Sequence, residues 1–123
     1  MILGFKERFV QPIMAGRKKH TIREDKHNRW RSGKQIHFAT GVRTKNYNNF
    51  KTGTCRSIQK IKIEYIGTFS YLDAEVKVDG KILSNEEINI LAKNDGFESI
   101  EDFFEWFNKD FKGKIIHWTD FKY

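Results

Sequence analysis

The sequence predicts a single α+β domain, in which a small mixed, mainly antiparallel β-barrel is flanked by helices. The length of 123 residues suffices for one hydrophobic core, but not for two. Aromatic residues make up 15% of the chain and include eleven Phe, so a few large side chains can fill that core. The predicted order is a strand, a short helix, three strands, a hairpin, two helices and a last strand. We therefore expect residues 1–123 to form one domain.

The chain begins with a short strand and a short helix. Ile2–Phe5 is an apolar run that suits a strand. The residues that follow place Phe9, Ile13 and Met14 on one helical face, and Gly16 suits the position just after a helix. We therefore expect the helix to end at a glycine corner.

Strands and loops alternate through the middle of the chain. β-Branched residues predict a strand within residues 19–23, and the polar residues 24–34 predict a loop. Alternation of polar and apolar residues predicts strands at 35–39 and, most clearly, at 55–65. Between them, residues 40–54 contain two glycines and three asparagines without a sustained period. We expect this stretch to be a long flexible loop and a candidate binding loop.

A hairpin and a last strand are predicted in the second half of the chain. Residues 74–83 form two short β-type runs around Asp79-Gly80, a pair that favours the positive φ angles of a tight turn. The apolar residues within 114–123 predict a final strand.

Two helices are predicted between the hairpin and the last strand. Each begins with a serine that is followed three residues later by an acidic residue, namely Ser84 with Glu87 and Ser99 with Asp102. The first helix should end near Lys93. The second has an apolar stripe made of Ile100, Phe103, Phe104 and Phe107.

The charge is distributed unevenly along the chain. Residues 1–62 contain sixteen Lys or Arg against three Asp or Glu, a balance of +13, whereas residues 63–123 have a balance of −6 from seven against thirteen. A basic half of this strength suits a phosphate-bearing partner such as RNA. A solvated basic surface that the acidic half offsets across the fold would give the same pattern.

Several classes of protein lack support in this sequence. No apolar run approaches the roughly 20 residues of a membrane span, and the N-terminal residues do not resemble a secretory signal. The lone Cys55 cannot form an internal disulfide, which fits a reducing compartment. We therefore expect a cytoplasmic protein without membrane contact.

Metal and cofactor chemistry is not indicated either. The available metal ligands His20, His27, His37, His117 and Cys55 lack the paired short spacings of zinc sites. Phosphate-binding glycine loops and the usual hydrolase signatures are absent. We expect no metal and no cofactor.

The most unusual stretch is AGRKKHTIR at residues 15–23. On a strand, side chains alternate between faces, so Lys19, Thr21 and Arg23 share one face. If the strand starts at His20, Lys18 lies in the preceding turn and can reach over Thr21. A threonine hydroxyl becomes a nucleophile when an adjacent base takes its proton, and a lysine can serve if burial or cationic neighbours depress its pKa. Spacing alone does not separate this reading from a phosphate-binding patch, because Arg17, Lys19 and Arg23 could hold an anion.

The same stretch resembles a known family. The array of Phe9, Ile13, Ala15, Gly16, Arg17, Lys18, Thr21, Ile22 and Arg23 is similar to the opening of ASCH domains, members of the PUA-like superfamily of RNA-associated barrel modules. Further resemblance lies in residues 30–38, in the strand after Cys55, in residues 94–107 and in the closing IIHWTDF segment. The resemblance covers nearly the whole chain and implies the PUA-like barrel.

Small bacterial ASCH proteins include amidohydrolases that remove the acetyl group from the exocyclic amine of acetylcytidine. The resemblance implies that Lys18 is the proton acceptor and Thr21 the nucleophile. The family has a glutamate as proton donor, where this chain has the shorter Asp95, with Glu98 and Glu101 as neighbouring alternatives. Arg23 or a backbone N–H at the corner could stabilise the oxyanion.

A non-catalytic RNA-binding module is the alternative function. In that case aromatic side chains would stack on bases and cations would hold phosphates, and the substrate or RNA-binding candidates are Arg17, Lys19, Arg23, Arg29, Trp30, Arg31, Arg43 and Tyr47. A ribonuclease that uses His20 or His37 as acid or base ranks below both. The expected partner is RNA or a modified nucleoside, and the oligomeric state is not predicted.

Overall fold

The computed structural model describes residues 1–66 and 74–123, which form two β-sheets packed with helices. The smaller sheet has the order β1-β3-β4 and the larger one β2-β8-β5-β6-β7. The strands are β1 Ile2–Gly4, β2 His20–Arg23, β3 Gln35–Thr40, β4 Asn48–Thr54, β5 Ser57–Tyr65, β6 Ala74–Val78, β7 Lys81–Ile82 and β8 Phe111–His117. The helices are α1 Val10–Met14, preceded by a 3₁₀ turn at Glu7–Phe9, α2 Asn85–Asn94 and α3 Ile100–Trp106.

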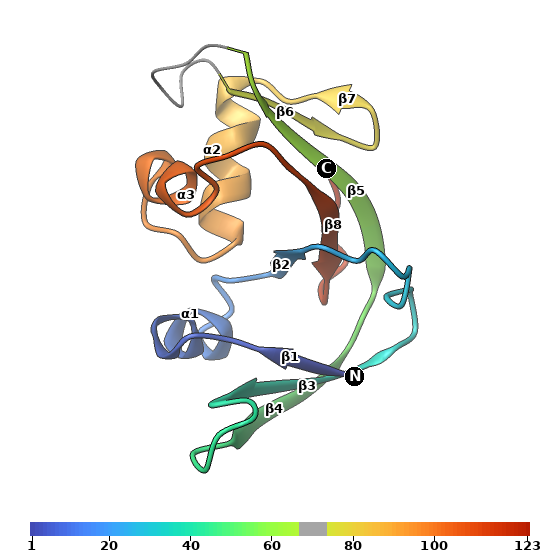
Figure 1. Cartoon of the computed structure of the whole chain (residues 1–123), viewed down its shortest axis with the longest axis vertical. Coiled ribbons are helices and arrows are strands. Elements are labelled where there is room, and N and C mark those ends of the chain that lie inside the picture. The colour runs from blue at the N-terminus through green and yellow to red at the C-terminus, as the bar shows by residue number, and fades with distance from the viewer. Residues whose placement is uncertain (67–73) are drawn as a thin grey trace.

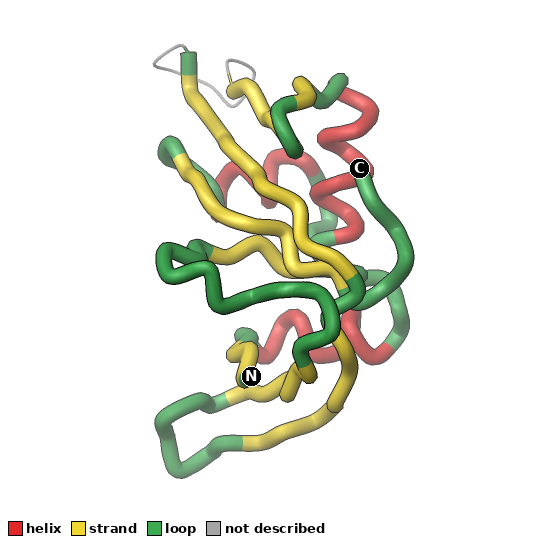
Figure 2. Tube along the Cα trace, turned by 90° about the vertical axis from the view of Figure 1, so that its right-hand side faces the viewer, coloured by secondary structure: helices red, strands yellow, loops and turns green. Residues whose placement is uncertain are grey.

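The predicted α+β class is confirmed, and the sheets are mostly antiparallel. Among the pairs in the described ranges only β1 and β3 run parallel. The chain passes from the smaller to the larger sheet where β4 leads into β5, and Figure 1 shows these two strands as one long arc with α2 and α3 on its inner side. In Figure 2 the strands of the larger sheet fan out above the smaller one. Within the described residues no strand pair closes the two sheets into one barrel.

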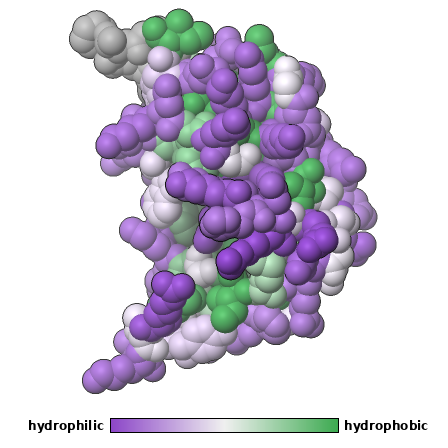
Figure 3. All heavy atoms as spheres, turned by 45° about the vertical axis from the view of Figure 1, so that its right-hand side comes forward, coloured by the Kyte–Doolittle hydropathy of each residue, from purple (hydrophilic) through white to green (hydrophobic). Residues whose placement is uncertain are grey.

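The hydrophobic core is one cluster to which both sheets and the three helices contribute. Alternation along β5 buries Ile61 and Ile63 and exposes Lys60 and Lys62, as a half-buried strand requires. Figure 3 shows that the side of the molecule brought forward in that view is mostly hydrophilic. None of the described helices has the length and apolarity that a membrane crossing would need.

Two helices end in the same way, at a glycine with positive φ. After α1, Gly16 has φ 80°, the Gly16 N–H donates to the Ile13 carbonyl and the Arg17 N–H donates to the Pro12 carbonyl. This pair of bonds is the Schellman motif, and it confirms the predicted glycine corner.

After α2, Gly96 has φ 92°, and the N–H groups of Gly96 and Phe97 donate to the carbonyls of Lys93 and Ala92. This second Schellman motif makes Asp95 the residue at the end of the helix.

The predicted local signals for the hairpin and for α2 are confirmed. Asp79 and Gly80 have φ of 50° and 81° in the turn between β6 and β7. Ser84 and Glu87 form a complete capping box at the start of α2. At the start of α3, the Ser99 hydroxyl accepts a hydrogen bond from the Asp102 N–H.

The prediction of a long loop at residues 40–54 is wrong for most of this stretch. Asn48–Thr54 forms β4, which pairs with β3 and leaves residues 41–47 as the connecting turn. The predicted last strand is also shifted, because β8 spans Phe111–His117 and ends before Trp118.

Two predicted side-chain positions are wrong as well. Met14 is 59% exposed and does not share the buried face of Phe9 and Ile13. Trp30, expected to stack on an RNA base, is buried in the hydrophobic core. The Asp25 carboxylate accepts hydrogen bonds from the backbone N–H groups of Arg29 and Trp30, and this loop conformation directs the indole inward.

Candidate active site

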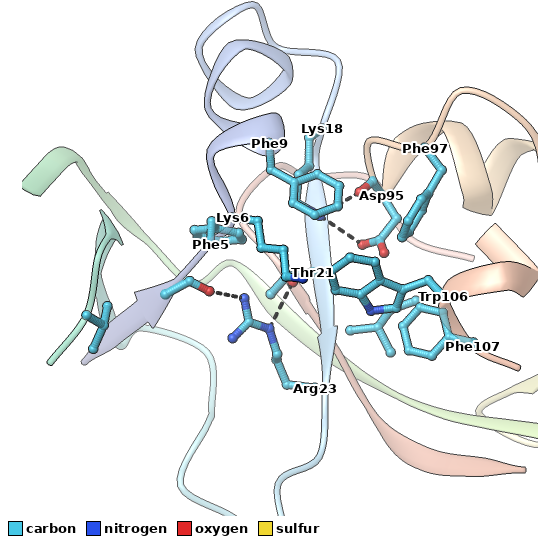
Figure 4. A pocket seen from close by; sticks show the side chains of 13 residues that line it. Phe5, Lys6, Phe9, Lys18, Thr21, Arg23, Asp95, Phe97, Trp106 and Phe107 are labelled. Carbon is cyan, nitrogen blue, oxygen red and sulfur yellow. Dashed lines mark hydrogen bonds and ion pairs between the residues drawn. The ribbon is translucent and has the colours of Figure 1, made fainter. Parts of the chain in front are cut away.

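A pocket of about 410 Å³ lies where β1, β2 and the loops after α1 and α2 meet. Lys18, Thr21 and Asp95 all line it, together with the cations Lys6 and Arg23. Its aromatic walls are formed by Phe5, Phe9, Phe97, Trp106 and Phe107 (Figure 4). The three residues predicted to be catalytic therefore lie around one concave site, although they are spread over 78 positions of the sequence.

Lys18 and Asp95 form a buried ion pair at the back of this pocket. The Lys18 ammonium donates to the Asp95 carbonyl at 2.6 Å and lies 3.3 Å from the Asp95 carboxylate oxygen Oδ1. The side chains are 2% and 4% exposed. The ammonium also lies 4.8 Å from the centre of the Phe9 ring, which is favourable for a desolvated cation.

The two helix ends bring this pair together. The Schellman turn after α1 directs the chain towards the end of α2, where the Lys19 N–H donates to the Asn94 carbonyl at 2.7 Å. The Lys18 ammonium occupies the negative end of the α2 dipole, a position that stabilises a cation. Gly96 leaves room for it, because a methyl group there would lie 3.0 Å from Cδ of Lys18.

The electrostatic environment favours a neutral Lys18 amine more than bulk water does. Burial lowers the pKa of Lys18 below its usual 10.5, and the charges of Arg23 and Arg8 act in the same direction. The Asp95 carboxylate opposes them by attraction and by hydrogen bonding. A lysine of this kind can accept a proton closer to neutral pH than an exposed one.

The Thr21 hydroxyl is held by Arg23 rather than by Lys18. The Arg23 Nε–H donates to Thr21 Oγ1 at 3.2 Å, and its NH2 group donates to the Gly4 carbonyl at 2.6 Å (Figure 4). The two side chains share one face of β2, as predicted from strand alternation. A guanidinium beside this oxygen stabilises negative charge that develops on it.

A chain of hydrogen bonds extends behind Asp95. The Asn94 amide donates to the Tyr123 hydroxyl at 3.2 Å, so the single hydroxyl hydrogen is free to be donated to His20 Nε2 at 2.5 Å. Burial raises the pKa of Tyr123, which keeps that hydrogen in place. A neutral His20 then carries its proton on Nδ1 and donates it to Asp95 Oδ1 at 3.0 Å.

His20 is completely buried and burial lowers its pKa, which favours this neutral form. Its ring packs edge-on against His117 with 5.1 Å between ring centres. The Gln59 side chain joins His117 and Tyr123: its Oε1 accepts from the Tyr123 N–H and lies 3.0 Å from His117 Nε2. These residues form a second layer that holds the Asp95 carboxylate.

Arg17 and Lys19 lie outside the pocket, in a neighbouring surface hollow. That hollow of about 720 Å³ is also lined by Lys93 and Glu98, and Phe97 separates it from the pocket because it lines both. Glu98 is exposed and faces this hollow, whereas Asp95 contacts Lys18 directly. Glu101 is exposed on α3.

The remaining predicted binding residues lie on two separate loops. Arg43 and Tyr47 are exposed in the turn between β3 and β4, which borders the pocket through Val42. Arg29 and Arg31 are exposed in residues 24–34, which Figure 1 places on the side of the molecule away from α1 and α3. The structure therefore does not gather the predicted RNA-binding residues into one surface.

Comparisons of the chain with protein-family models, curated proteins and solved structures gave no significant match. Across residues 1–66 and 74–123, no group of three or more His, Cys, Asp or Glu side chains is arranged to hold a metal ion. The geometry of the pocket therefore has to support any functional assignment.

Lys6, Trp106 and Tyr123 were missed as site residues in the sequence, and His20 was considered only as a metal ligand or as the acid or base of a ribonuclease. His20 and Tyr123 support Asp95 from behind, while Lys6 and Trp106 line the mouth of the pocket. His20 lies inside the basic stretch at residues 15–23, but nothing in its spacing indicates a contact with position 95. Lys6, Trp106 and Tyr123 carry no local signal, because only the folded chain brings them to the site.

Proposed function

We propose that this protein is an amidohydrolase that removes an acyl group from the exocyclic amine of an acetylcytidine-like nucleoside. The observation that carries the proposal is the buried Lys18–Asp95 pair in the same pocket as Thr21. A lysine with a lowered pKa, a hydroxyl and a carboxylate can act as base, nucleophile and proton donor in amide hydrolysis. The pocket volume of about 410 Å³ lies within the range of small-molecule sites.

The proposed reaction has two steps. Neutral Lys18 takes the Thr21 hydroxyl proton as Oγ1 attacks the acetyl carbonyl, and the C–N bond breaks as a proton reaches the leaving amine. Asp95, which contacts Lys18, passes that proton on. Water then attacks the acetyl-threonine ester and releases acetate, which restores the hydroxyl.

Arg23 has a supporting role in this proposal. Its Nε–H already donates to Thr21 Oγ1, so it stabilises the oxygen that loses a proton in the first step. Burial lowers the pKa of Arg23, yet the guanidinium stays a cation because no ordinary condition removes its proton.

The test is acetate and cytidine release from N4-acetylcytidine. Thr21→Ala should lower kcat by at least about a thousandfold, and Lys18→Ala by about a hundredfold or more, while circular dichroism shows a retained fold. Thr21→Ser should keep measurable activity because it keeps a hydroxyl. Lys26→Ala is the control, since its side chain is 77% exposed and lies outside the pocket. The absence of turnover across a panel of acylated nucleosides would refute the proposal.

Non-catalytic RNA binding is the second proposal, and it is favoured by one observation. Val42 lines the pocket, so the turn that carries the exposed Arg43 and Tyr47 lies at its edge and could hold an RNA strand there. RNA affinity that falls steeply with salt, together with an inactive wild-type protein, would support this function instead. The ribonuclease alternative has less support, because His20 is buried behind Asp95 and His37 lies on β3 of the other sheet.

The PUA-like barrel belongs to the same proposal. The corner at residues 15–23, the position of Asp95 before Gly96 and the two curved sheets are consistent with an ASCH domain. An experimental structure in which the two sheets pack as an open barrel around the same pocket would support the assignment.

A further inference from the structure

Trp106 is an exposed aromatic side chain at the mouth of the pocket. Its side chain is 43% exposed, although Phe9 and Phe97 pack against its ring with centre distances of 5.6 and 5.8 Å. Trp30 is buried in the core, and Trp118 packs edge-on against Phe38 at 4.8 Å. Trp106 is therefore the tryptophan placed to stack on a planar ligand that enters the pocket.

Lys6 is a cation beside this tryptophan, and among the described residues it has no anionic partner. Its ammonium lies 5.2 Å from the centre of the Trp106 ring, and Figure 4 shows the side chain reaching across the pocket. The neighbouring cations are engaged: Lys18 by Asp95, Arg8 by Asp102 at 2.6 Å, and Arg23 by the Thr21 hydroxyl and the Gly4 carbonyl. In the described parts of the chain, Lys6 has neither an ion pair nor a side-chain hydrogen bond.

The lining of the pocket has an excess of positive charge. Lys6, Lys18 and Arg23 face a single carboxylate, Asp95. One positive charge remains in excess even when Lys18 is neutral. An uncharged nucleoside would leave this charge uncompensated, whereas a phosphate group would pair with it.

We propose that the ligand of this pocket is a nucleotide, whose base stacks on Trp106 and whose phosphate binds Lys6. This inference rests on the proposed function for the base, and it goes beyond that function by requiring a phosphate. The phosphate can belong to a free nucleotide or to one residue of an RNA chain. Lys6 has to leave the face of the indole when the base arrives, and its exposed, unpaired side chain is free to do so.

Equilibrium binding to the inactive Thr21→Ala protein tests the inference. The probes are N4-acetylcytidine, its 5′-monophosphate and a short single-stranded RNA with one acetylcytidine. We expect the monophosphate to bind about tenfold more tightly than the nucleoside, because one additional charge-assisted contact strengthens binding by about this factor. Lys6→Gln should abolish this preference without weakening nucleoside binding, whereas Lys26→Gln should preserve it. Trp106→Ala should weaken all three ligands by at least about fivefold.

The outcomes separate the inference from the proposed activity. Equal affinity for nucleoside and monophosphate, or a preference that survives Lys6→Gln, overturns the inference even if the wild type releases acetate. A phosphate preference that depends on Lys6 supports the inference even if the wild type releases no acetate. In that case only the proposed amidohydrolase activity is refuted. Tighter binding of the RNA than of the monophosphate assigns the phosphate to an RNA chain, and weaker binding assigns it to a free nucleotide. A protein that binds none of the three refutes both.

Discussion

The Nδ1 atom of His20 lies 3.0 Å from Oδ1 of Asp95, and this bond connects the pocket to a buried polar layer. The Lys18 ammonium contacts the same oxygen, and the Tyr123 hydroxyl in turn contacts His20. A carboxylate oxygen that is held by a cation and by a neutral donor has a restricted position. The site can therefore be tested through residues that do not reach the pocket.

Removal of Lys18 should destabilise the fold as well as abolish activity. Lys18→Met leaves the buried Asp95 carboxylate without its cation, and we expect the free energy of unfolding to fall by about 3 kcal/mol. Adding Asp95→Asn should recover part of this loss, since the amide keeps an oxygen for His20 but carries no charge. Urea denaturation of the two single variants and the double variant measures the coupling. Strictly additive effects would show that the pair is not coupled.

Gly16 and Gly96 provide a matched comparison. Both follow a helix with positive φ, so a change to Ala costs about 1–2 kcal/mol of backbone strain at either position. A methyl group at Gly16 meets nothing within 4 Å, whereas one at Gly96 lies 3.0 Å from Lys18 and 3.2 Å from Phe9. Gly96→Ala should therefore destabilise the protein more in thermal or urea unfolding, and it alone should impair the site. Equal losses of stability and activity would contradict the close approach of Lys18.

Tyr123→Phe should disturb His20 without touching the pocket. The change removes the hydroxyl that donates to His20 Nε2, and an unsatisfied buried group costs about 1–3 kcal/mol. The ¹⁵N chemical shifts of the His20 ring should reveal the altered hydrogen bond and any change of tautomer. Tyr47→Phe is the control, because that side chain is 45% exposed. Unchanged His20 shifts in Tyr123→Phe would refute the proposed direction of the hydrogen bonds.

Stability should fall in mild acid because of His117. Burial, with smaller contributions from the charges of His20 and Lys122, lowers the pKa of His117 from 6.5 to about 3. Between these two values the unfolded chain binds a proton that the folded chain does not, so the free energy of unfolding decreases as pH falls through this window. One such group contributes at most about 1.4 kcal/mol per pH unit.

His117→Gln tests this pH dependence. Glutamine cannot titrate, and its amide can still donate towards Gln59. Urea unfolding between pH 6.5 and pH 4 should therefore show a shallower loss of stability in the variant than in the wild type. Identical slopes would assign the acid sensitivity to other groups.

Local signals in the sequence predicted local structure well. The turn at Asp79-Gly80, the cap at Ser84 and the glycine corner at Gly16 depend on a few neighbouring residues, and each is confirmed. The strand at Asn48–Thr54 was missed because its two asparagines and its glycine disfavour strands, and pairing with β3 determines its conformation. The burial of Trp30 was missed for a similar reason, since it depends on how the Asp25 loop folds.

Prediction of the site from sequence needed more than the spacing of its residues. Strand alternation placed Thr21 and Arg23 on one face, but it could not choose between catalysis and phosphate binding. A family resemblance implied that Lys18 and Asp95 belong to one site, although the two residues are 77 positions apart. No rule of sequence spacing reaches that far, and the roles of these residues stay predictions until activity is measured.

The long sequence separation of Lys18 and Asp95 has a consequence for folding. A contact across 77 residues forms late in folding, because a long stretch of chain must first be ordered. Until α2 docks against the turn after α1, Lys18 is solvated and has the basicity of any exposed lysine. We therefore expect an ordinary amine at this position in a nascent or partly unfolded chain, and an amine with a lowered pKa only after α2 has docked. Chemical reactivity at Lys18 therefore reports on the completeness of the fold.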